Sequence, residues 1–124
     1  MLVDDSRAVR LKLKNILVEL GHEIVAELSD GALLVREFEK YRPDVVTLDV
    51  VMPEMNGLTA LEEIRKHHPD ARVVMVTSAA TVSNMMKAKS LGALHFITKP
   101  FRREKVEAVF RDLGHEKLPK EDAA

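Results

Sequence analysis

The feature that most constrains the fold is residues 45–49, VVTLD, an almost unbroken apolar run that ends on an acid. β-Branched residues without polar alternation are typical of a strand that is buried on both faces, as strands of parallel sheets are. Met52-Pro53 and Asn56-Gly57 follow directly and indicate a turn. The pattern therefore places Asp49 at the carboxyl end of a buried strand, where open α/β sheets bind their ligands.

Composition excludes several classes of protein. The chain has 124 residues, enough for one domain with a hydrophobic core, and its net charge of −1 gives no general attraction to nucleic acid or anionic membranes. It has no cysteine, which excludes disulfides and cysteine-based metal or nucleophile chemistry. No apolar run approaches the roughly 20 residues of a membrane span, and the start lacks the pattern of a signal peptide. We expect a cytoplasmic protein without a direct nucleic-acid or membrane partner.

Apolar segments typical of strands alternate with amphipathic helical patterns five times. This order predicts an α/β fold, a doubly wound, five-stranded parallel sheet with helices on both faces. We expect one domain over residues 1–114 and a polar tail or linker over residues 115–124. The expected strands are residues 1–3, 23–27, 44–49, 71–77 and 94–98, and the expected helices lie between Ser6 and Gly21, Asp30 and Tyr41, Gly57 and His67, Val82 and Gly92, and Phe101 and Gly114.

Two details of these elements can be checked against the structure. The first strand is short for a central position, since strands usually have about 5–6 residues. Helical spacing places Leu11 among the apolar residues of the first helix, and Leu33 on the inner stripe of the second.

Polar side chains stand at the ends of four of the five expected strands. Asp4 and Asp5 follow the first strand, Asp49 ends the third, Thr77 ends the fourth and Lys99 follows the fifth. Because parallel strands bring their carboxyl ends to one edge, these side chains should lie together. Each residue alone has an ordinary alternative: Asp4 or Asp5 as a helix cap, Asp49 as a turn acid, Thr77 as a plain strand end, Lys99 as a surface charge. Their joint occurrence favours a functional site.

The chemistry of this set points to phosphoryl transfer. Three neighbouring carboxylates would raise one another's pKa unless a cation lay among them. Oxygen ligands of this kind suit Mg²⁺, which takes a few carboxylates together with waters and phosphate oxygens. Lys99 supplies a positive charge for one phosphoryl oxygen and Thr77 a hydroxyl for another. The set resembles a site in which a carboxylate accepts the phosphoryl group.

The segments that carry these residues are similar to the motifs of a known family. Asp4-Asp5, residues 49–57 (DVVMPEMNG), residues 77–79 (TSA) and residues 99–101 (KPF) have the order and spacing found in the receiver domain of two-component response regulators. The resemblance covers about residues 1–114. It implies a flavodoxin-like sheet with strand order 2-1-3-4-5, as in CheY-like proteins.

The resemblance also implies roles for the acidic residues. Asp49 would be phosphorylated by a histidine kinase. Asp5 and Asp49 would bind Mg²⁺ through their carboxylates, with Asp4 acting directly or through water. Val51 would contribute its backbone carbonyl to the same ion.

A conformational switch is implied by the same comparison. Thr77 would bind the phosphoryl group and shift inward, and Lys99 would pair with a phosphoryl oxygen. The Lys99–Pro100 bond would be cis, as proline permits. Phe96 falls at the aromatic switch position of the family, although an ordinary core aromatic explains it equally well.

The quoted motifs look most like the chemotaxis CheY class, which is a signalling domain rather than an enzyme. The implied partners are a chemotaxis kinase and a protein target, such as a flagellar switch protein, on the face of the fourth helix, fifth strand and fifth helix. Met85 and Met86, with Lys89 and residues 101–103, are candidate contacts there. Core packing explains at least one of the two methionines equally well.

Other interpretations keep part of this pattern. The chain could be a phosphorelay intermediate, or the receiver of a longer regulator with an effector domain. A haloacid-dehalogenase-like phosphatase also uses an aspartate and Mg²⁺, but it needs a second acid two residues after the nucleophile, where this chain has Val51. An interaction module that works without phosphorylation is disfavoured by the complete set of Asp5, Asp49, Thr77 and Lys99.

Val51 and Ala79 bear on how long the phosphoryl group would last. Both are apolar, whereas relatives carry polar side chains there that position the attacking water. The resemblance therefore implies autodephosphorylation that is slower than in receivers with an amide and an acid at these positions.

Overall fold

The computed structural model describes residues 1–115, and its centre is a parallel five-stranded sheet. The strand order is β2-β1-β3-β4-β5, which confirms the expected doubly wound arrangement. β3 pairs with both β1 and β4, so that Asp49 follows the middle strand. The strands are β1 (Leu2–Val3), β2 (Glu27–Leu28), β3 (Val46–Leu48), β4 (Val73–Thr77) and β5 (His95–Thr98).

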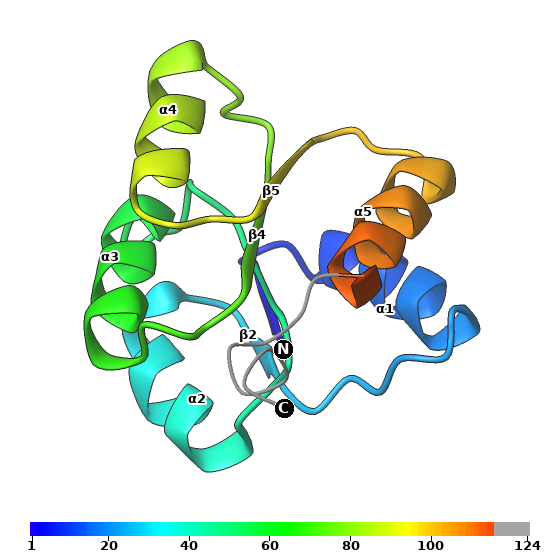
Figure 1. Cartoon of the computed structure of the whole chain (residues 1–124), viewed down its shortest axis with the longest axis horizontal. Helices are drawn as coiled ribbons and strands as arrows, with labels where there is room; N and C mark the ends of the chain where they lie inside the picture. The colour runs from blue at the N-terminus through cyan, green and yellow to red at the C-terminus, as the bar shows by residue number, and fades with distance from the viewer. Residues whose placement is uncertain (116–124) are drawn as a thin grey trace.

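Helices cover both faces of the sheet, as expected. Figure 1 shows α1 and α5 on one side and α2, α3 and α4 on the other. A short 3₁₀ turn, η1, precedes α2. The bounds are α1 (Arg7–Glu19), η1 (Gly31–Leu33), α2 (Leu34–Tyr41), α3 (Gly57–His67), α4 (Val82–Ser90) and α5 (Arg103–His115).

The unbroken apolar strands are explained by two separate core layers. In β4, Val73 and Met75 pack into the layer under α2 and α3, whereas Val74 and Val76 pack into the layer under α1 and α5. All four are at most 1% exposed. A strand buried on both faces has no position for a solvent-facing polar side chain, so the sequence shows no alternation.

The second strand is shorter than expected. The ladder pairs only Glu27 and Leu28, with Leu2 and Val3 of β1. Residues 23–25 lie outside any strand, and Ala26 contributes one bond, from Leu2 N to its carbonyl at 3.0 Å. The reason is that β1 supplies two residues as partners, so the extent of β2 follows the length of its neighbour.

Two leucines are more exposed than their spacing suggested. Leu11 is 56% exposed and Leu33 is 44% exposed. Leu33 ends a 3₁₀ turn, in which three residues make one turn, so its side chain is out of phase with the apolar stripe of α2. Asp30 begins this turn by accepting a hydrogen bond from Ala32 N at 2.8 Å.

The last helix ends at His115, one residue beyond the expected boundary. The rest of the expected tail, residues 116–124, lies outside the described residues. Within residues 1–115, no helix is both long enough and apolar enough to cross a membrane.

Candidate phosphoryl-transfer site

The polar strand ends do meet at one edge of the sheet. Asp4 and Asp49 sit on neighbouring strands: Asp4 N donates to Leu28 O at 3.0 Å, and Asp49 N donates to Val3 O at 3.1 Å. The side chains of both acids are buried, with Asp4 3% and Asp49 5% exposed. Asp5, one residue further along, is exposed. The edge therefore combines two buried carboxylates with one that reaches solvent.

These three acids form a group that could hold a metal ion. Asp4, Asp5 and Asp49 can each offer one carboxylate oxygen within 4.8 Å of the others. Hard oxygen donors with one open, solvated side fit Mg²⁺, which retains several waters. Val51 lies beside the group, because its N–H donates to Asp49 Oδ1 at 3.3 Å. Val51 itself is 59% exposed, which leaves room above this side of the site.

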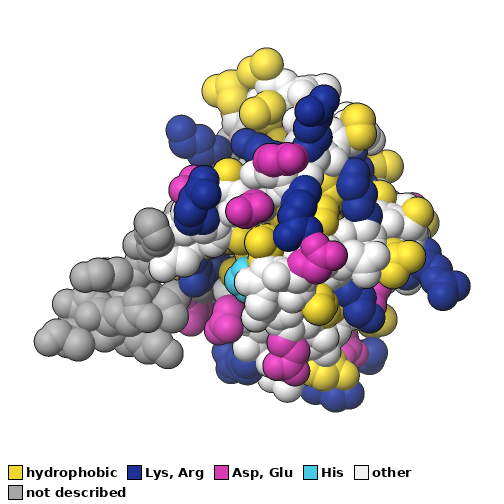
Figure 2. Space-filling model, turned by 90° about the vertical axis from the view of Figure 1, so that its right-hand side faces the viewer, with side chains coloured by type: hydrophobic (Ala, Val, Ile, Leu, Met, Phe, Trp, Pro, Cys, Tyr) yellow, Lys and Arg dark blue, Asp and Glu magenta, His cyan; other side chains and the backbone are white. Residues whose placement is uncertain are grey.

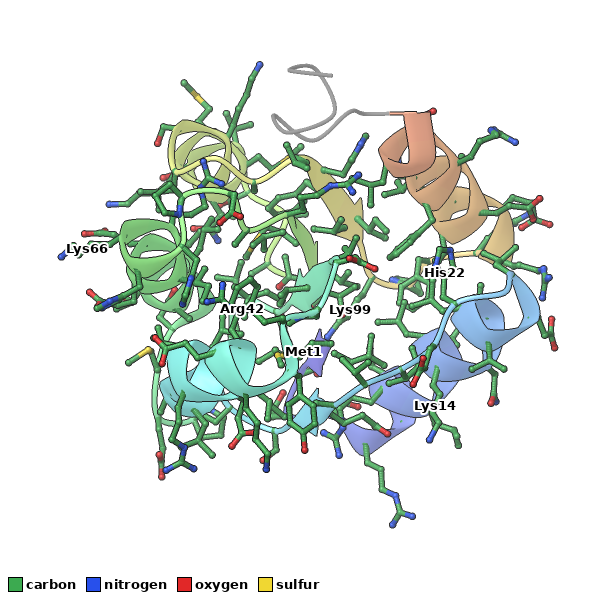
Figure 3. The ribbon with its side chains drawn as sticks, turned by 60° about the horizontal axis from the view of Figure 1, so that its bottom comes forward. Met1, Lys14, His22, Arg42, Lys66 and Lys99 are labelled. Atoms are coloured by element: carbon green, nitrogen blue, oxygen red, sulfur yellow. The ribbon has the colours of Figure 1, made fainter. Side chains whose placement is uncertain are left out.

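Lys99 lies between the two buried carboxylates. Its Nζ is 2.7 Å from Asp4 Oδ2 and 3.0 Å from Asp49 Oδ2. Burial alone would lower the pKa of Lys99, but its hydrogen bonds to the two acids outweigh burial and raise the pKa. The ammonium group is therefore a permanent cation at neutral pH. Figure 3 labels Lys99, which extends from the end of β5.

The ionised form of Asp4 remains disfavoured although Lys99 is its partner. Burial raises the pKa of Asp4, and this effect exceeds the opposing hydrogen bonds from Lys99 and Ser6 N. Ser6 N donates to Asp4 Oδ1 at 2.9 Å, but the residue that caps α1 is Ser6, whose hydroxyl accepts from Val9 N at 3.3 Å. The helix-cap interpretation of Asp4 is therefore wrong. A second cation nearby would stabilise the ionised form of such a carboxylate.

Thr77 is fully buried at the end of β4, next to the same edge. Its carbonyl accepts a hydrogen bond from Lys99 N at 2.9 Å, and its Oγ1 accepts one from Ala79 N at 3.1 Å. Asn84 Nδ2 in turn donates to Ala79 O at 2.9 Å, which ties the loop after β4 to α4. Thr77 is therefore linked by hydrogen bonds to Lys99 directly and to α4 through Ala79 and Asn84.

Gly57 holds the main chain of Asp49 in place, a role that sequence reasoning missed. Gly57 N donates to Val50 O at 2.6 Å. A Cβ at Gly57 would lie only 1.8 Å from the Asp49 carbonyl oxygen. The sequence showed Asn56-Gly57 only as a turn, because the approach of α3 to β3 is a tertiary contact.

Asp30 is a second residue whose part in this region the sequence showed incompletely. The sequence predicts Asp30 as a helix cap, and one oxygen does accept from Ala32 N at 2.8 Å. The other oxygen accepts from Glu54 N at 2.9 Å, across to the loop that follows Asp49. Burial opposes ionisation of Asp30, but the backbone N–H groups that it accepts from outweigh burial and lower its pKa.

The candidate partner surface contains an apolar groove of about 390 Å³ between α4 and β5, lined by Met85, Met86, Leu94 and Phe96 among others. Both methionines are exposed, Met85 by 42% and Met86 by 66%, so the idea that one of them packs in the core is wrong. Phe96 is half-buried and packs against the core layer. Figure 2 shows apolar side chains gathered at the top of the molecule, the end where α4 lies in Figure 1.

Comparison with known proteins places these features in a family context. Residues 1–111 match the family model of the response regulator receiver domain. The chain is 41% identical to chemotaxis protein CheY of Bacillus subtilis (strain 168), over 92% of this chain and 96% of that protein. It is also 41% identical to protein CcdB of the same organism, over 93% of this chain and 97% of that protein.

A solved structure agrees with the sequence relatives. The CheX–CheY–BeF3–Mg+2 complex from Borrelia burgdorferi matches with a TM-score of 0.87 at 32% identity, covering 90% of this chain and 85% of that chain.

Proposed function

This chain belongs to the response regulator receiver domains, and from that premise we propose that it accepts a phosphoryl group on Asp49 from a histidine kinase. The observation that supports this most directly is the position of Lys99, whose ammonium lies 3.0 Å from an oxygen of Asp49. A cation held beside the acceptor can stabilise the negative charge on the oxygens of the incoming phosphoryl group.

The proposed reaction is a displacement at phosphorus. A carboxylate oxygen of Asp49 forms a bond to the phosphorus of a phosphohistidine, and the phosphorus–nitrogen bond breaks, with the electron pair leaving on the imidazole. Asp4, Asp5, Asp49 and the Val51 carbonyl would hold Mg²⁺, which supplies positive charge to the phosphoryl oxygens. The Mg²⁺ in the similar CheY complex and the acidic group described here support this assignment.

The conformational switch would use the hydrogen bonds that connect Thr77, through Ala79, to Asn84 on α4. The Thr77 hydroxyl would turn toward a phosphoryl oxygen, giving up its bond to Ala79 N. Phe96 is half-buried and lines the α4–β5 groove, so a shift of the loop after β4 would change the space available to it. Phosphorylation would then bias a two-state element rather than create a new one.

The output would be protein binding in the cytoplasm, on the face formed by α4, β5 and α5. The apolar groove there, with Met85 and Met86 exposed, offers adaptable contacts. Relatives named as chemotaxis proteins favour a chemotaxis kinase as the donor and a flagellar switch protein as the target. In this proposal residues 1–114 form the receiver, and the chain signals by binding rather than by turning over a substrate.

Acetyl phosphate and Mg²⁺, followed by intact-mass measurement, test the central step. The wild-type chain should gain one phosphoryl group, Asp49→Asn should gain none, and removal of Mg²⁺ with a chelator should abolish the gain. Asp70→Asn is the matched control, because Asp70 is an exposed acid in a loop away from the site. A phosphoryl gain that persists in Asp49→Asn would overturn the assignment of the acceptor.

A further inference from the structure

Lys12, on α1, reaches across to the turn that follows β5. Its Nζ donates to Phe101 O at 2.7 Å. The same ammonium lies 4.5 Å from the centre of the Phe101 ring, and that ring is buried, with Phe101 6% exposed. One lysine therefore binds both the main chain and the side chain of a residue in another element, a combination that neither charge patterning nor helical spacing predicts.

The turn that Lys12 contacts is the one that carries Lys99. Lys99 and Phe101 are separated only by Pro100, which has no N–H to donate. On the sheet side, Lys99 N is held by Thr77 O at 2.9 Å. On the helix side, Phe101 O is held by Lys12. The three-residue turn is thus tied down at both ends, once by the sheet and once by α1.

The direction of the Lys99 side chain depends on how this turn is held. Its ammonium must reach two acceptors on different strands, Asp4 and Asp49, at 2.7 and 3.0 Å. If the Phe101 end were released, the peptide planes of the turn could rotate, and the long Lys99 side chain would spend less time between the two carboxylates. The Phe101 ring would still be packed in the core under α1 and α5, so the fold would survive.

We propose that Lys12 is a positioning residue that holds the Lys99–Phe101 turn so that the Lys99 ammonium stays between Asp4 and Asp49. The inference rests on the proposed function for its role in phosphoryl transfer, but the positioning itself concerns the resting protein. It assigns to α1 a part in setting the acceptor site.

A metal titration tests the positioning without any phosphoryl chemistry. Lys99 occupies the carboxylates that would bind Mg²⁺, so releasing it should tighten Mg²⁺ binding measured by calorimetry. We expect Lys12→Met to raise Mg²⁺ affinity by about two- to threefold, and Lys12→Arg to leave it near the wild-type value, because arginine keeps the charge and the donor. Lys14→Met controls for the lost charge: Lys14, labelled in Figure 3, lies on the same helix, and its ammonium pairs with Glu27 at 3.5 Å.

A double-mutant cycle separates positioning from general destabilisation. In a Lys99→Met background, Lys12→Met should have no further effect on Mg²⁺ affinity, because the side chain that it positions is absent. An equal gain in both backgrounds, or an equal gain from Lys14→Met, would show a charge effect and overturn the proposal.

The rate of phosphoryl gain from acetyl phosphate at saturating Mg²⁺ gives the second readout. It should fall by about three- to tenfold in Lys12→Met, recover in Lys12→Arg, and not fall further when Lys12→Met is added to Lys99→Met. If the wild-type chain gains no phosphoryl group, the proposed function fails, and the metal titration still decides whether Lys12 positions Lys99. Unchanged Mg²⁺ affinity in Lys12→Met contradicts the inference whatever the rates are.

Discussion

The ammonium of Lys99 lies 2.7 Å from Asp4 Oδ2, and the same group lies 3.0 Å from Asp49 Oδ2. One cation thus compensates two buried carboxylates, and it does so by occupying the space next to the proposed acceptor. Without it, the two acids would repel each other in a site of low solvent content. In the proposed function Mg²⁺ would bind the carboxylates that Lys99 contacts, so the ion and the lysine would compete for them.

This competition predicts opposite effects of one substitution. Lys99→Met keeps the approximate length of the side chain and removes its charge. A cation at this distance from a carboxylate shifts the carboxylate's pKa by about one unit or more, which corresponds to a factor of about ten in binding. We therefore expect Mg²⁺ affinity to rise by about tenfold. The rate of phosphoryl gain should nevertheless fall, because the cation that follows the transferred charge is gone. Calorimetry and intact-mass kinetics measure the two effects.

The control for Lys99→Met is Lys66→Met, on the outer side of α3 (Figure 3), where the side chain is 65% exposed. It should change neither quantity. Tighter Mg²⁺ binding by Lys66→Met, or no change in Lys99→Met, would argue against competition at the acidic group.

Gly57→Ala should disturb the acceptor strand directly. The added Cβ would lie 1.8 Å from Asp49 O, so α3 or β3 must move, and we expect the free energy of unfolding to fall by about 3 kcal/mol. Urea denaturation measures this loss. Gly114→Ala in α5 is the control: among residues 1–115 a Cβ there meets nothing within 4 Å, and helix propensity should make it neutral or stabilising by about 0.5 kcal/mol. Equal stability of the two variants would contradict the contact.

Asp30 should make stability depend on pH in the acid range. Its pKa is lowered in the folded state, so its contribution is present above the ordinary value of 3.8 and is lost as the pH falls through the lower folded value. Asp30→Ala should cost about 1 kcal/mol at neutral pH, as for other caps, and the difference from wild type should shrink in acid. Denaturant unfolding at several pH values measures this.

The outcome that would contradict the Asp30 prediction is a difference that stays constant or grows as the pH falls. Asp30→Asn refines the test, because asparagine can still accept hydrogen bonds but does not titrate. It should lose the pH-dependent part of the stability and keep most of the cap.

The apolar residues near the acceptor predict a long-lived phosphoryl group. Val51 is 59% exposed and Ala79 is half-buried, so both positions can take a larger polar side chain. Val51→Asn and Ala79→Glu should speed the loss of phosphate from Asp49, by about tenfold when combined, because each could orient the attacking water. Decay of the phosphorylated mass after removal of the donor measures the rate. The idea fails if neither change accelerates the decay.

The polar residues at the strand ends could be predicted because each one is positioned by the strand that directly precedes it in the sequence. Asp49, Thr77 and Lys99 each lie at the carboxyl end of their own strand. Because the strands are parallel, these ends meet at one edge of the sheet. The cis Lys99–Pro100 bond, implied by family resemblance, is present as well. Whether these residues carry the proposed roles stays a prediction until the phosphorylation experiment is done.

Other features escaped prediction because they depend on a neighbour. The extent of β2 depends on β1, and the exposure of Met85 and Met86 depends on what covers α4 in the folded chain. Helical spacing treats an apolar residue as buried, but it cannot tell whether a second element lies opposite.

Sequence alone determined the alternation of strands and helices, the burial of β3 and β4 on both faces, and the set of acidic, hydroxyl and amino groups at one edge. These features follow from hydrophobic periodicity and from the order of segments along the chain, and both can be read from the sequence without the folded structure. Only the tertiary structure decided that Lys99 lies between Asp4 and Asp49, that Gly57 touches the Asp49 main chain, and that Lys12 reaches Phe101. Such contacts join residues up to 95 positions apart, and their geometry is set by how helices pack on the sheet, which no local pattern encodes.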